Sequence, residues 1–332
     1  MRRVAWAAVV ALLVSACGMG GGGDELTIYS GRSRDLVEPL LNEFAESSGI
    51  PIAVKYGDST DLALLLAEEG DRSPADVFFS QSPGTVGFLG GQGLLAPLAA
   101  DLVEPVPAEY RSRSDQWVGV TARQRVLVYN AEMVGEDELP ESVHDLTQPG
   151  YRGKVGVAPS NASFQDFVTA MRQHSGDDAT LDWLEGMAAN ESPVYANNNA
   201  IVEAVSRGEI PLGLVNHYYN ERFLAEDPAL PSRNHRFPDD DIGSLVIESS
   251  VSVLASSDKQ QQAAKFIAFL LSESSQEYFA TETFEYPLVG DVQPAGDLPP
   301  LADIKGPEVD IEALGGGFAQ TQELIDRSGI AG

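Results

Sequence analysis

The 332-residue chain has a single cysteine, Cys17, so it cannot form an internal disulfide bond. It is also poor in positive charge, with 21 Lys and Arg against 50 Asp and Glu and a formal net charge of −29. This balance argues against nucleic acid as a partner, because nucleic-acid binding requires clustered Lys and Arg. It favours solubility and attracts cations over long range, although a general acidic bias of the source proteome would give the same balance.

Long apolar runs are scarce as well. The uncharged run Val4 to Val14 is too short to span a bilayer, which takes about 20 residues. It follows Met1-Arg-Arg3 and precedes small residues, which is the pattern of a signal peptide. Val14-Ser-Ala-Cys17 resembles a bacterial lipobox, whose cysteine is lipidated and becomes the first mature residue; an ordinary signal peptide with a chance cysteine is the alternative. We expect a signal peptide over residues 1–16, then lipidated Cys17 and a Gly-rich tether over 17–24.

Short apolar runs alternate with amphipathic helical patterns in the first part of the mature chain. Strand patterns at 26–30, 50–56 and 75–79 are separated by helix patterns. In the first helix pattern, one face carries the apolar residues Leu36, Val37, Leu40, Leu41 and Phe44. This order predicts a mostly parallel sheet with helices on both faces.

The alternation resumes further along, and the hydrophobic share of 43% is normal for a globular protein. Roughly 300 mature residues allow one large domain or two ordinary ones. Frequent Pro, Gly and Asp predict an extended connection over 290–307. The later strand patterns are 124–129, 154–158, 210–215, 244–248 and 250–255, and the later helix patterns are 164–174, 181–187, 200–207, 259–271 and 318–327.

Two adjacent tyrosines, Tyr218 and Tyr219, follow the strand pattern 210–215. A free tyrosine titrates at a pH of about 10 and is a poor ligand at neutral pH, but a bound metal ion lowers the pKa of its ligand. Ferric iron is a hard acid and phenolate is a hard anionic oxygen, so the pair suggests an Fe(III) site. Half-buried aromatics at a strand end are the alternative. Alternation along an extended strand would aim the neighbouring His217 away from the site.

Other patterns that carry chemistry are weak. The four histidines, His144, His174, His217 and His235, lack the spacing of metal ligands. Asp239-Asp-Asp241 is more typical of a solvated acidic turn than of a cation site. The sequence has no nucleophile elbow, phosphate-binding loop or dinucleotide fingerprint, so we expect no enzyme activity.

Several short blocks occur in a fixed order along the chain. They are Ile28-Tyr-Ser-Gly-Arg32, Ser73-Pro-Ala-Asp-Val-Phe-Phe79, Gly93-Leu-Leu-Ala-Pro-Leu98, Arg123-Gln-Arg-Val-Leu-Val-Tyr-Asn130, Gly153-Lys-Val-Gly-Val-Ala-Pro-Ser160, Asn216-His-Tyr-Tyr219, Gln276-Glu-Tyr-Phe-Ala280 and Glu285-Tyr-Pro287. In their order and spacing, the chain resembles the iron(III) substrate-binding proteins of bacterial ABC importers from Leu26 to about Val289. This family belongs to the periplasmic-binding-protein superfamily, type II.

The resemblance implies an α/β fold with two lobes, each a mostly parallel sheet flanked by helices, and a ligand cleft that closes by a hinge motion. Lobe 1 would comprise residues 24–123 plus 250–300. Lobe 2 would comprise residues 124–249 plus 301–332, with the C-terminal tail packed on it.

The resemblance also implies the site. Tyr218 and Tyr219 match iron-binding tyrosines, and Arg32 matches an arginine whose fork holds a carbonate-type anion beside the iron. The loop 160–163 precedes a helix pattern, where free backbone N–H groups favour an anion. The implied anion contacts are Arg32, Ser160, Asn161, Ala162, Ser163, Asn198, Asn216 and Arg123.

The chain departs from the family where relatives carry further iron ligands. Ser33 stands in place of a histidine, Gln81 in place of a glutamate and Ser163 in place of a third tyrosine. An exogenous anion, such as carbonate, phosphate or citrate, must then complete the coordination of iron, with Ser33 and Gln81 as candidate further contacts. An iron chelate, an organophosphate, a sugar or thiamine remains an alternative ligand.

These patterns predict a monomeric, lipid-anchored binding protein on the extracytoplasmic face of the bacterial membrane or in the periplasm. It would capture Fe(III) with a synergistic anion and deliver it to the permease and ATPase of an ABC importer. A secreted hydrolase and a scaffold lipoprotein without transport are the rival classes.

Overall fold

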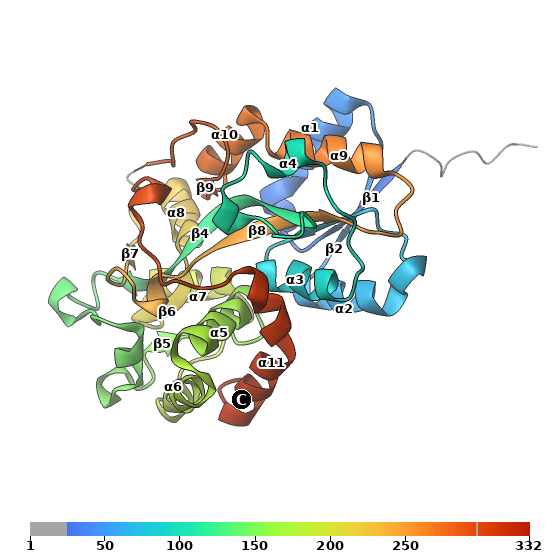
Figure 1. The fold of residues 1–332 in the computed structure, drawn as a ribbon. Coiled ribbons are helices and arrows are strands. Elements are labelled where there is room, and N and C mark those ends of the chain that lie inside the picture. Colours follow the sequence, from blue (N-terminus) through green and yellow to red (C-terminus); the bar gives the residue numbers. More distant parts are fainter. Residues whose placement is uncertain (1–24, 297) are drawn as a thin grey trace, which may run out of the picture.

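The computed structural model describes residues 25–296 and 298–332, in which helices and strands alternate (Figure 1). The predicted signal peptide, Cys17 and the tether lie outside the described residues. In the described ranges no helix has both the length and the apolar character that a membrane crossing needs.

The first part of the chain forms the parallel sheet that its alternation predicts, in the order β2-β1-β3. In the first helix, all five apolar residues of the predicted face are buried. The elements are β1 (Leu26–Ser30), α1 (Arg34–Ser48), β2 (Ile52–Tyr56), α2 (Ser59–Glu69), β3 (Val77–Ser80), α3 (Pro83–Gly91) and α4 (Ala100–Val103).

Two long antiparallel strands, β4 (Trp117–Asn130) and β8 (Val246–Val253), run through the middle of the molecule. From Trp117 to Gln124, β4 pairs with β8, and from Arg125 onward it pairs with β6 and β7. Across the described ranges the order is β2-β1-β3-β8-β4-β6-β5, with β7 and β9 also pairing with β4. The sheet is therefore mixed, and the predicted mostly parallel arrangement holds only for β2-β1-β3 and β5-β6.

The two strands predicted at 244–248 and 250–255 are one strand, β8. The polar pair Ser249 and Ser250 does not interrupt it, because both residues continue the pairing with β4. The hydroxyls of Ser249 and Thr121 form a buried hydrogen bond of 2.7 Å. The register between β4 and β8 shifts at a β-bulge between Gly119 and Thr121 of β4.

The middle of the chain contributes the strands and helices on the other side of β4. β5 is shorter than predicted because it pairs with β6 only at Val155 and Gly156. The elements are β5 (Val155–Gly156), α5 (Ala162–Ser175), α6 (Asp177–Ala189), α7 (Asn198–Ser206), β6 (Leu212–Asn216), α8 (His217–Glu226) and β7 (Ser232–His235).

The C-terminal part returns to both sides of the molecule. α9 and α10 lie beside α1 and α4, whereas α11 packs on α5 and α6 (Figure 1). The segment before α11, η8 (Glu312–Gly317), packs against α3, and a Cβ on Gly315 would lie 2.3 Å from the backbone nitrogen of Phe88. The remaining elements are α9 (Gln260–Leu270), α10 (Glu273–Thr281), β9 (Tyr286–Pro287) and α11 (Phe318–Ser328).

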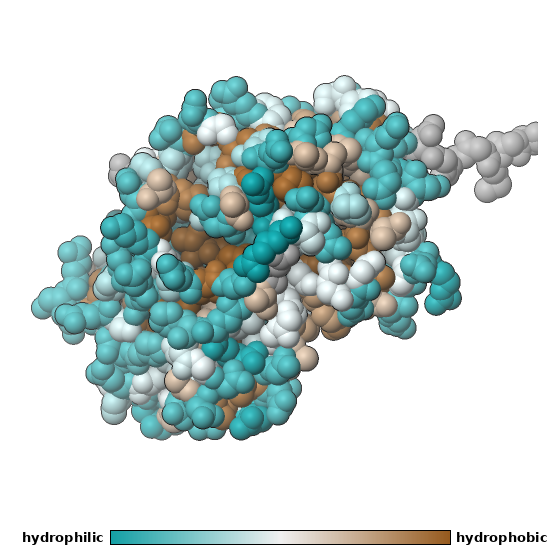
Figure 2. Space-filling model, in the orientation of Figure 1, coloured by the Kyte–Doolittle hydropathy of each residue, from teal (hydrophilic) through white to brown (hydrophobic). Residues whose placement is uncertain are grey.

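Hydrophilic side chains cover most of the face shown in Figure 2, and apolar groups gather in a hollow near its centre. Inside, the buried apolar residues of the described ranges form separate clusters. One includes Leu40, Phe44 and Phe266, and another includes Phe167 and Trp183.

Candidate functional site

Tyr218 and Tyr219 lie in the first turn of helix α8 rather than beyond a continuing strand. β6 ends at Asn216, and the chain becomes helical at His217. The two rings stack with 4.1 Å between their centroids and are 0% and 5% exposed. The pair is therefore buried at a helix start, and the alternative interpretation of half-buried aromatics at a strand end is wrong.

The side chain of Gln81, directly after β3, reaches both phenols. Its Nε2 donates to the Tyr219 Oη at 3.0 Å and to the Tyr218 Oη at 3.3 Å. A hydrogen bond to the charged form of a group favours that form, so this amide stabilises phenolates.

The phenol of Tyr218 resists ionisation when no metal ion is bound. Burial raises the pKa of Tyr218 well above its ordinary value, and the neighbouring Tyr219 raises it further, while Arg32 acts in the opposite direction. Tyr218 is therefore protonated at neutral pH, and a cation that binds its oxygen must displace the proton.

Arg32 is buried and forms a forked pair with Glu285. Its Nη1 and Nη2 donate to the two carboxylate oxygens at 2.9 and 2.5 Å. Thr121 and Thr283 also donate to this carboxylate, at 2.9 and 3.0 Å. Burial alone would lower the pKa of Arg32, but the Glu285 carboxylate raises it. The guanidinium fork of Arg32, which was expected to hold an anion, thus binds Glu285. Of the three guanidinium nitrogens of Arg32, only Nε has no hydrogen-bond partner among the described residues.

The loop 160–163 leads into α5 as predicted, and Asn161 caps that helix. The Asn161 Oδ1 accepts from the backbone N of Ser163 at 3.2 Å and from its hydroxyl at 2.6 Å. Asn198 donates to the same oxygen at 3.2 Å. Asn161, Ser163 and Asn198 therefore form one connected polar cluster.

Two buried arginines on β4 lie behind the phenols. Arg123 donates to the backbone oxygen of Gln81, and Arg125 donates to that of Leu214 at 3.2 Å. Burial lowers the pKa of Arg125 to about 9. Arg123 Nε and Nη1 and both side-chain polar atoms of Asn216 have no partner in the described ranges. The positive charges of Arg123 and Arg125 favour negative charge on the nearby tyrosines.

His217 is turned away from the site, but not for the predicted reason. It is helical, and two backbone groups hold its ring: its Nδ1 accepts from Gln124 N at 3.1 Å, and its Nε2 lies 2.8 Å from Phe284 O. Burial lowers its pKa to about 4, so the ring is neutral.

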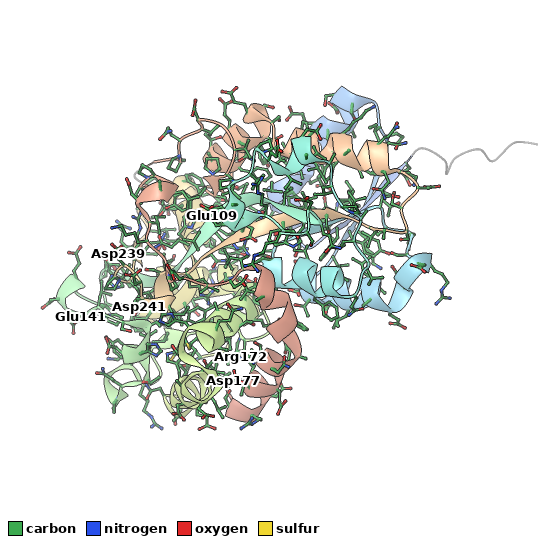
Figure 3. All side chains as sticks on the ribbon, in the orientation of Figure 1. Glu109, Glu141, Arg172, Asp177, Asp239 and Asp241 are labelled. Carbon is green, nitrogen blue, oxygen red and sulfur yellow. The ribbon has the colours of Figure 1, made fainter. Side chains whose placement is uncertain are left out.

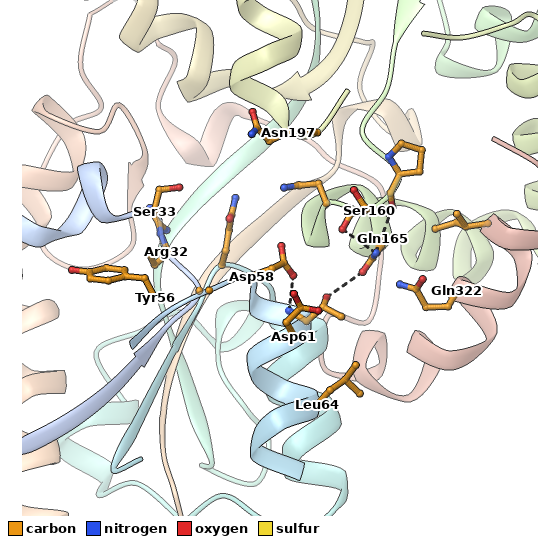
Figure 4. A pocket seen from close by; sticks show the side chains of 18 of the residues that line it. Arg32, Ser33, Tyr56, Asp58, Asp61, Leu64, Ser160, Gln165, Asn197 and Gln322 are labelled. Carbon is orange, nitrogen blue, oxygen red and sulfur yellow. Dashed lines mark hydrogen bonds between the residues drawn. The ribbon is translucent and has the colours of Figure 1, made fainter. Parts of the chain in front are cut away.

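A cleft of about 800 Å³ opens in front of Tyr219 (Figure 4). Of the predicted site residues, it is lined by Arg32, Ser33, Gln81, Ser160, Asn161 and Tyr219. The others, namely Tyr218, Arg123, Ala162, Ser163, Asn198 and Asn216, are buried and do not line it.

The cleft also contains carboxylates that the sequence patterns did not assign to the site. Asp58 and Asp61, at the start of α2, line it together with Asp326 of α11. Asp58 caps α2 by accepting from Thr60 N at 2.8 Å, and burial raises its pKa. An aspartate just before a helix pattern predicts a cap, but only the fold shows that this cap faces a cleft.

Carboxylates elsewhere do not form a metal site. Within the described ranges no group of three or more His, Cys, Asp and Glu is placed to hold a metal ion. Asp241, which is labelled in Figure 3 and does not line the cleft, accepts from Ser142 Oγ at 2.6 Å and from Gly243 N at 2.7 Å. The acidic turn therefore has a structural role, and iron in the cleft would depend on the phenols and an added ligand.

Comparisons with known proteins agree with this geometry. A family model described as bacterial extracellular solute-binding protein matches residues 72–308. The Fe(3+)-binding periplasmic protein of Serratia marcescens is 32% identical over 99% of this chain and 99% of its own length. The major ferric iron-binding protein of Neisseria meningitidis serogroup B is 33% identical over 86% and 87%.

Two solved structures share the fold. Iron-bound HitA from Pseudomonas aeruginosa superposes with a TM-score of 0.88 at 33% identity, covering 92% of this chain and 100% of that one. FutA from Trichodesmium in complex with iron and citrate has a TM-score of 0.77 at 28% identity, covering 92% and 99%. These matches confirm the predicted two-lobed α/β fold.

Proposed function

Because this chain belongs to the bacterial extracellular solute-binding protein family, we propose that it captures ferric iron outside the cytoplasm and delivers it to an ABC importer. This is a family of transport proteins rather than enzymes. The observation that carries the proposal is the buried pair Tyr218 and Tyr219 at a cleft, with the Gln81 amide on both phenol oxygens.

The surroundings of the phenols suit Fe(III). Iron displaces the phenol protons and leaves two phenolates, each of which accepts a hydrogen bond from Gln81. The Arg32–Glu285 pair is neutral as a unit, so the positive charges of Arg123 and Arg125 are those that balance the phenolates from behind. A hard trivalent ion held by two phenolates keeps open coordination positions on the cleft side.

We propose that a small anion fills those positions from the loop 160–163. Ser160 and Asn161 line the cleft at the start of α5, where backbone N–H groups favour negative charge. Asn198 supports this loop by hydrogen bonds to Asn161 and Ser163, and Ala162 and Ser163 are its buried residues. Arg32 and Asn216 contribute through side-chain polar atoms that have no partner in the described ranges. Ser33 offers a hydroxyl that makes no capping bond. Carbonate, phosphate and citrate all fit this chemistry, and citrate accompanies iron in the Trichodesmium relative.

The lobe division 24–123 plus 250–300 and 124–249 plus 301–332 is part of the proposal. Its support is the change of β4 partners between Gln124 and Arg125. The signal peptide, the lipid on Cys17, the tether, the monomeric state and the permease and ATPase partners are proposed from the sequence pattern and the family.

Metal analysis tests the function directly. Protein purified without chelators should carry one iron per chain in native mass spectrometry, with an additional mass that identifies the anion, and citrate stripping should remove both. The Tyr218→Phe, Tyr219→Phe double variant should carry none. Tyr151→Phe is the control, because it removes an exposed hydroxyl outside the cleft and should leave iron binding unchanged. Iron retained by the double variant would contradict the proposal.

The size of the cleft favours an iron chelate as a second candidate. About 800 Å³ exceeds what one ion and a small oxyanion fill. The same mass spectra separate the candidates, because a chelate adds the mass of its organic ligand and a sugar, organophosphate or thiamine adds mass without iron.

A further inference from the structure

A buried hydrogen bond joins the two sides of the cleft behind the phenols. Ser82, just before α3, donates from Oγ to the Asp166 Oδ1 near the start of α5 at 2.7 Å. Asp166 is 5% exposed, and its Oδ2 has no hydrogen-bond partner in the described ranges. A Cβ on Gly84 would lie 2.7 Å from Oδ1, so glycine allows this carboxylate to approach α3 closely. The bond therefore connects elements on opposite sides of the long strands.

Two further polar contacts at the cleft are longer or more exposed to solvent. Thr60 donates to Gln165 at 3.2 Å at the cleft wall, as the dashed line in Figure 4 shows. Arg222 pairs with Asp35 at 3.0 Å, but more than half of the Asp35 side chain is exposed, so solvent screens the pair. Among these cross-cleft contacts, Asp166 alone places an ionisable group in a dry environment.

Three charged groups face Asp166 from the elements around it. Arg123 of β4 attracts its negative charge, whereas Asp58 at the start of α2 repels it. Glu248 of β8 is buried beside Arg123, with both oxygens unpaired, and burial raises its pKa to about 8. Ser82 and the backbone of Gly84 contribute hydrogen bonds from α3, and Leu314 of η8 lies against Gly84. Burial outweighs the attractive contributions and raises the pKa of Asp166 to about 6.

We propose that Asp166 is a closure residue, whose contact with Ser82 sets the balance between the open and closed cleft in the iron-free protein. The inference rests on the proposed division into two lobes that close over the cleft, but it does not depend on iron as the ligand. Closing the cleft transfers Asp166 from water into a dry contact, and a neutral carboxyl is easier to bury than a carboxylate.

The direction of the pH effect follows from linkage. When the cleft is open, Asp166 has the pKa of a solvated aspartate, about 3.9. When the cleft is closed, burial raises the pKa of Asp166 to about 6. The closed form binds the proton more tightly, so acidification from pH 7 towards pH 4 shifts the iron-free protein towards closure. This is opposite to the effect of acid on the phenolates, which iron must deprotonate.

The placement of Asp166 couples closure to the anion loop. It lies on the same helix as Ser163, one turn further along, and follows Gln165, which lines the cleft. A movement of α5 on closure therefore carries the anion loop and Asp166 together towards α3.

Small-angle X-ray scattering of the iron-free protein from pH 4.5 to pH 8 tests the proposal. The wild type should become more compact on acidification, and the change should develop between the closed-state pKa of about 6 and the open-state pKa of about 3.9. Asp166→Asn keeps an acceptor for Ser82 but cannot ionise, so it should be compact at every pH. Asp178→Asn removes an exposed carboxylate of α6 and should follow the wild type. A wild-type pH profile in Asp166→Asn, or no pH response in the wild type, would overturn the proposal.

A second variant tests the same contact if Asp166→Asn does not fold. Ser82→Ala removes only the donor and should be more open than the wild type at pH 5, and an unchanged radius of gyration at that pH would also overturn the proposal. The Tyr218→Phe, Tyr219→Phe variant should keep the full pH profile. A wild type that binds no iron but keeps its pH profile would remove the iron proposal alone, and a wild type that binds iron but shows no pH response would remove the closure proposal alone.

Discussion

The phenols of Tyr218 and Tyr219 must lose their protons in a buried place, and the neighbouring residues decide how difficult that is. Burial opposes the ionisation of Tyr218, whereas the cations nearby favour it. The Gln81 amide donates hydrogen bonds to both phenol oxygens and carries no charge. It therefore stabilises the phenolates, whereas a carboxylate in its place would repel them and bind the metal ion itself.

Gln81→Leu should therefore weaken iron binding roughly 100-fold, because it removes two hydrogen bonds to charged groups that contribute about 1.5 kcal/mol each. Competition titration against a chelator of known affinity measures the loss. Gln322→Leu is the matched control, since Gln322 lines the same cleft from α11 and makes no hydrogen bond to the phenols. Equal losses in the two variants would show that the Gln81 amide has no special role.

The tyrosine pair could be predicted from the sequence because adjacency on the chain ensures adjacency in space. The partner of Arg32 could not. Glu285 lies 253 residues away, and only the fold shows that it occupies the fork of Arg32 that was expected to hold an anion. Asp58 and Asp166 were missed for the same reason, since a helix cap and a helical aspartate carry no sign of the cleft they face.

At the scale of elements, the ion pair of Arg32 and Glu285 ties the end of β1 to the segment before β9. Both side chains are fully buried, and the carboxylate accepts from Thr121 of β4 as well. Burial alone would raise the pKa of Glu285, but Arg32 lowers it, so the pair is ionised. The pair therefore fixes the position of Arg32 beside the phenols.

Glu285→Ala should lower the free energy of unfolding by about 3–5 kcal/mol, because it leaves the Arg32 charge buried without a partner. Glu38→Ala removes the partner of Arg34 from an exposed helical pair and should cost about 0.5 kcal/mol or less. Urea denaturation of both variants measures the difference. A small loss for Glu285→Ala would mean that water or another group readily takes the place of its carboxylate.

Helices were predicted well because each carries its own periodic pattern, as the buried face of α1 shows. Strand limits were less predictable, because they depend on distant partners. Ser249 and Ser250 look like a break in the sequence, yet their hydrogen-bonding partners on β4 keep β8 continuous. The start of α8 at His217 was missed because strand alternation and a first helical turn look alike over three residues.

At the scale of the whole molecule, two lobes meet across a cleft whose rim carries Asp58, Asp61 and Asp326. The net charge of −29 attracts cations to the molecule, but the phenols provide the site that selects among them. Protons are therefore the main competitors of iron.

The apparent dissociation constant for iron should rise about 100-fold for each unit by which pH falls below neutral, because two phenols release one proton each. Chelator competition at pH 7.5 and pH 6.5, with the anion concentration fixed and the chelator's own protonation corrected, measures the slope. Tyr219→Phe should reduce the slope to about tenfold per unit. A slope near zero in the wild type would mean that the phenols do not ionise on binding.

The visible absorption spectrum of the iron-loaded protein tests the central claim most directly, because only phenolate bound to Fe(III) gives a phenolate-to-iron charge-transfer band. The wild type should be coloured, should lose the band on citrate stripping and should regain it when Fe(III) and the anion are restored. The Tyr218→Phe, Tyr219→Phe variant should be colourless under the same loading. A band of undiminished intensity in that variant would contradict the assignment of iron to this tyrosine pair.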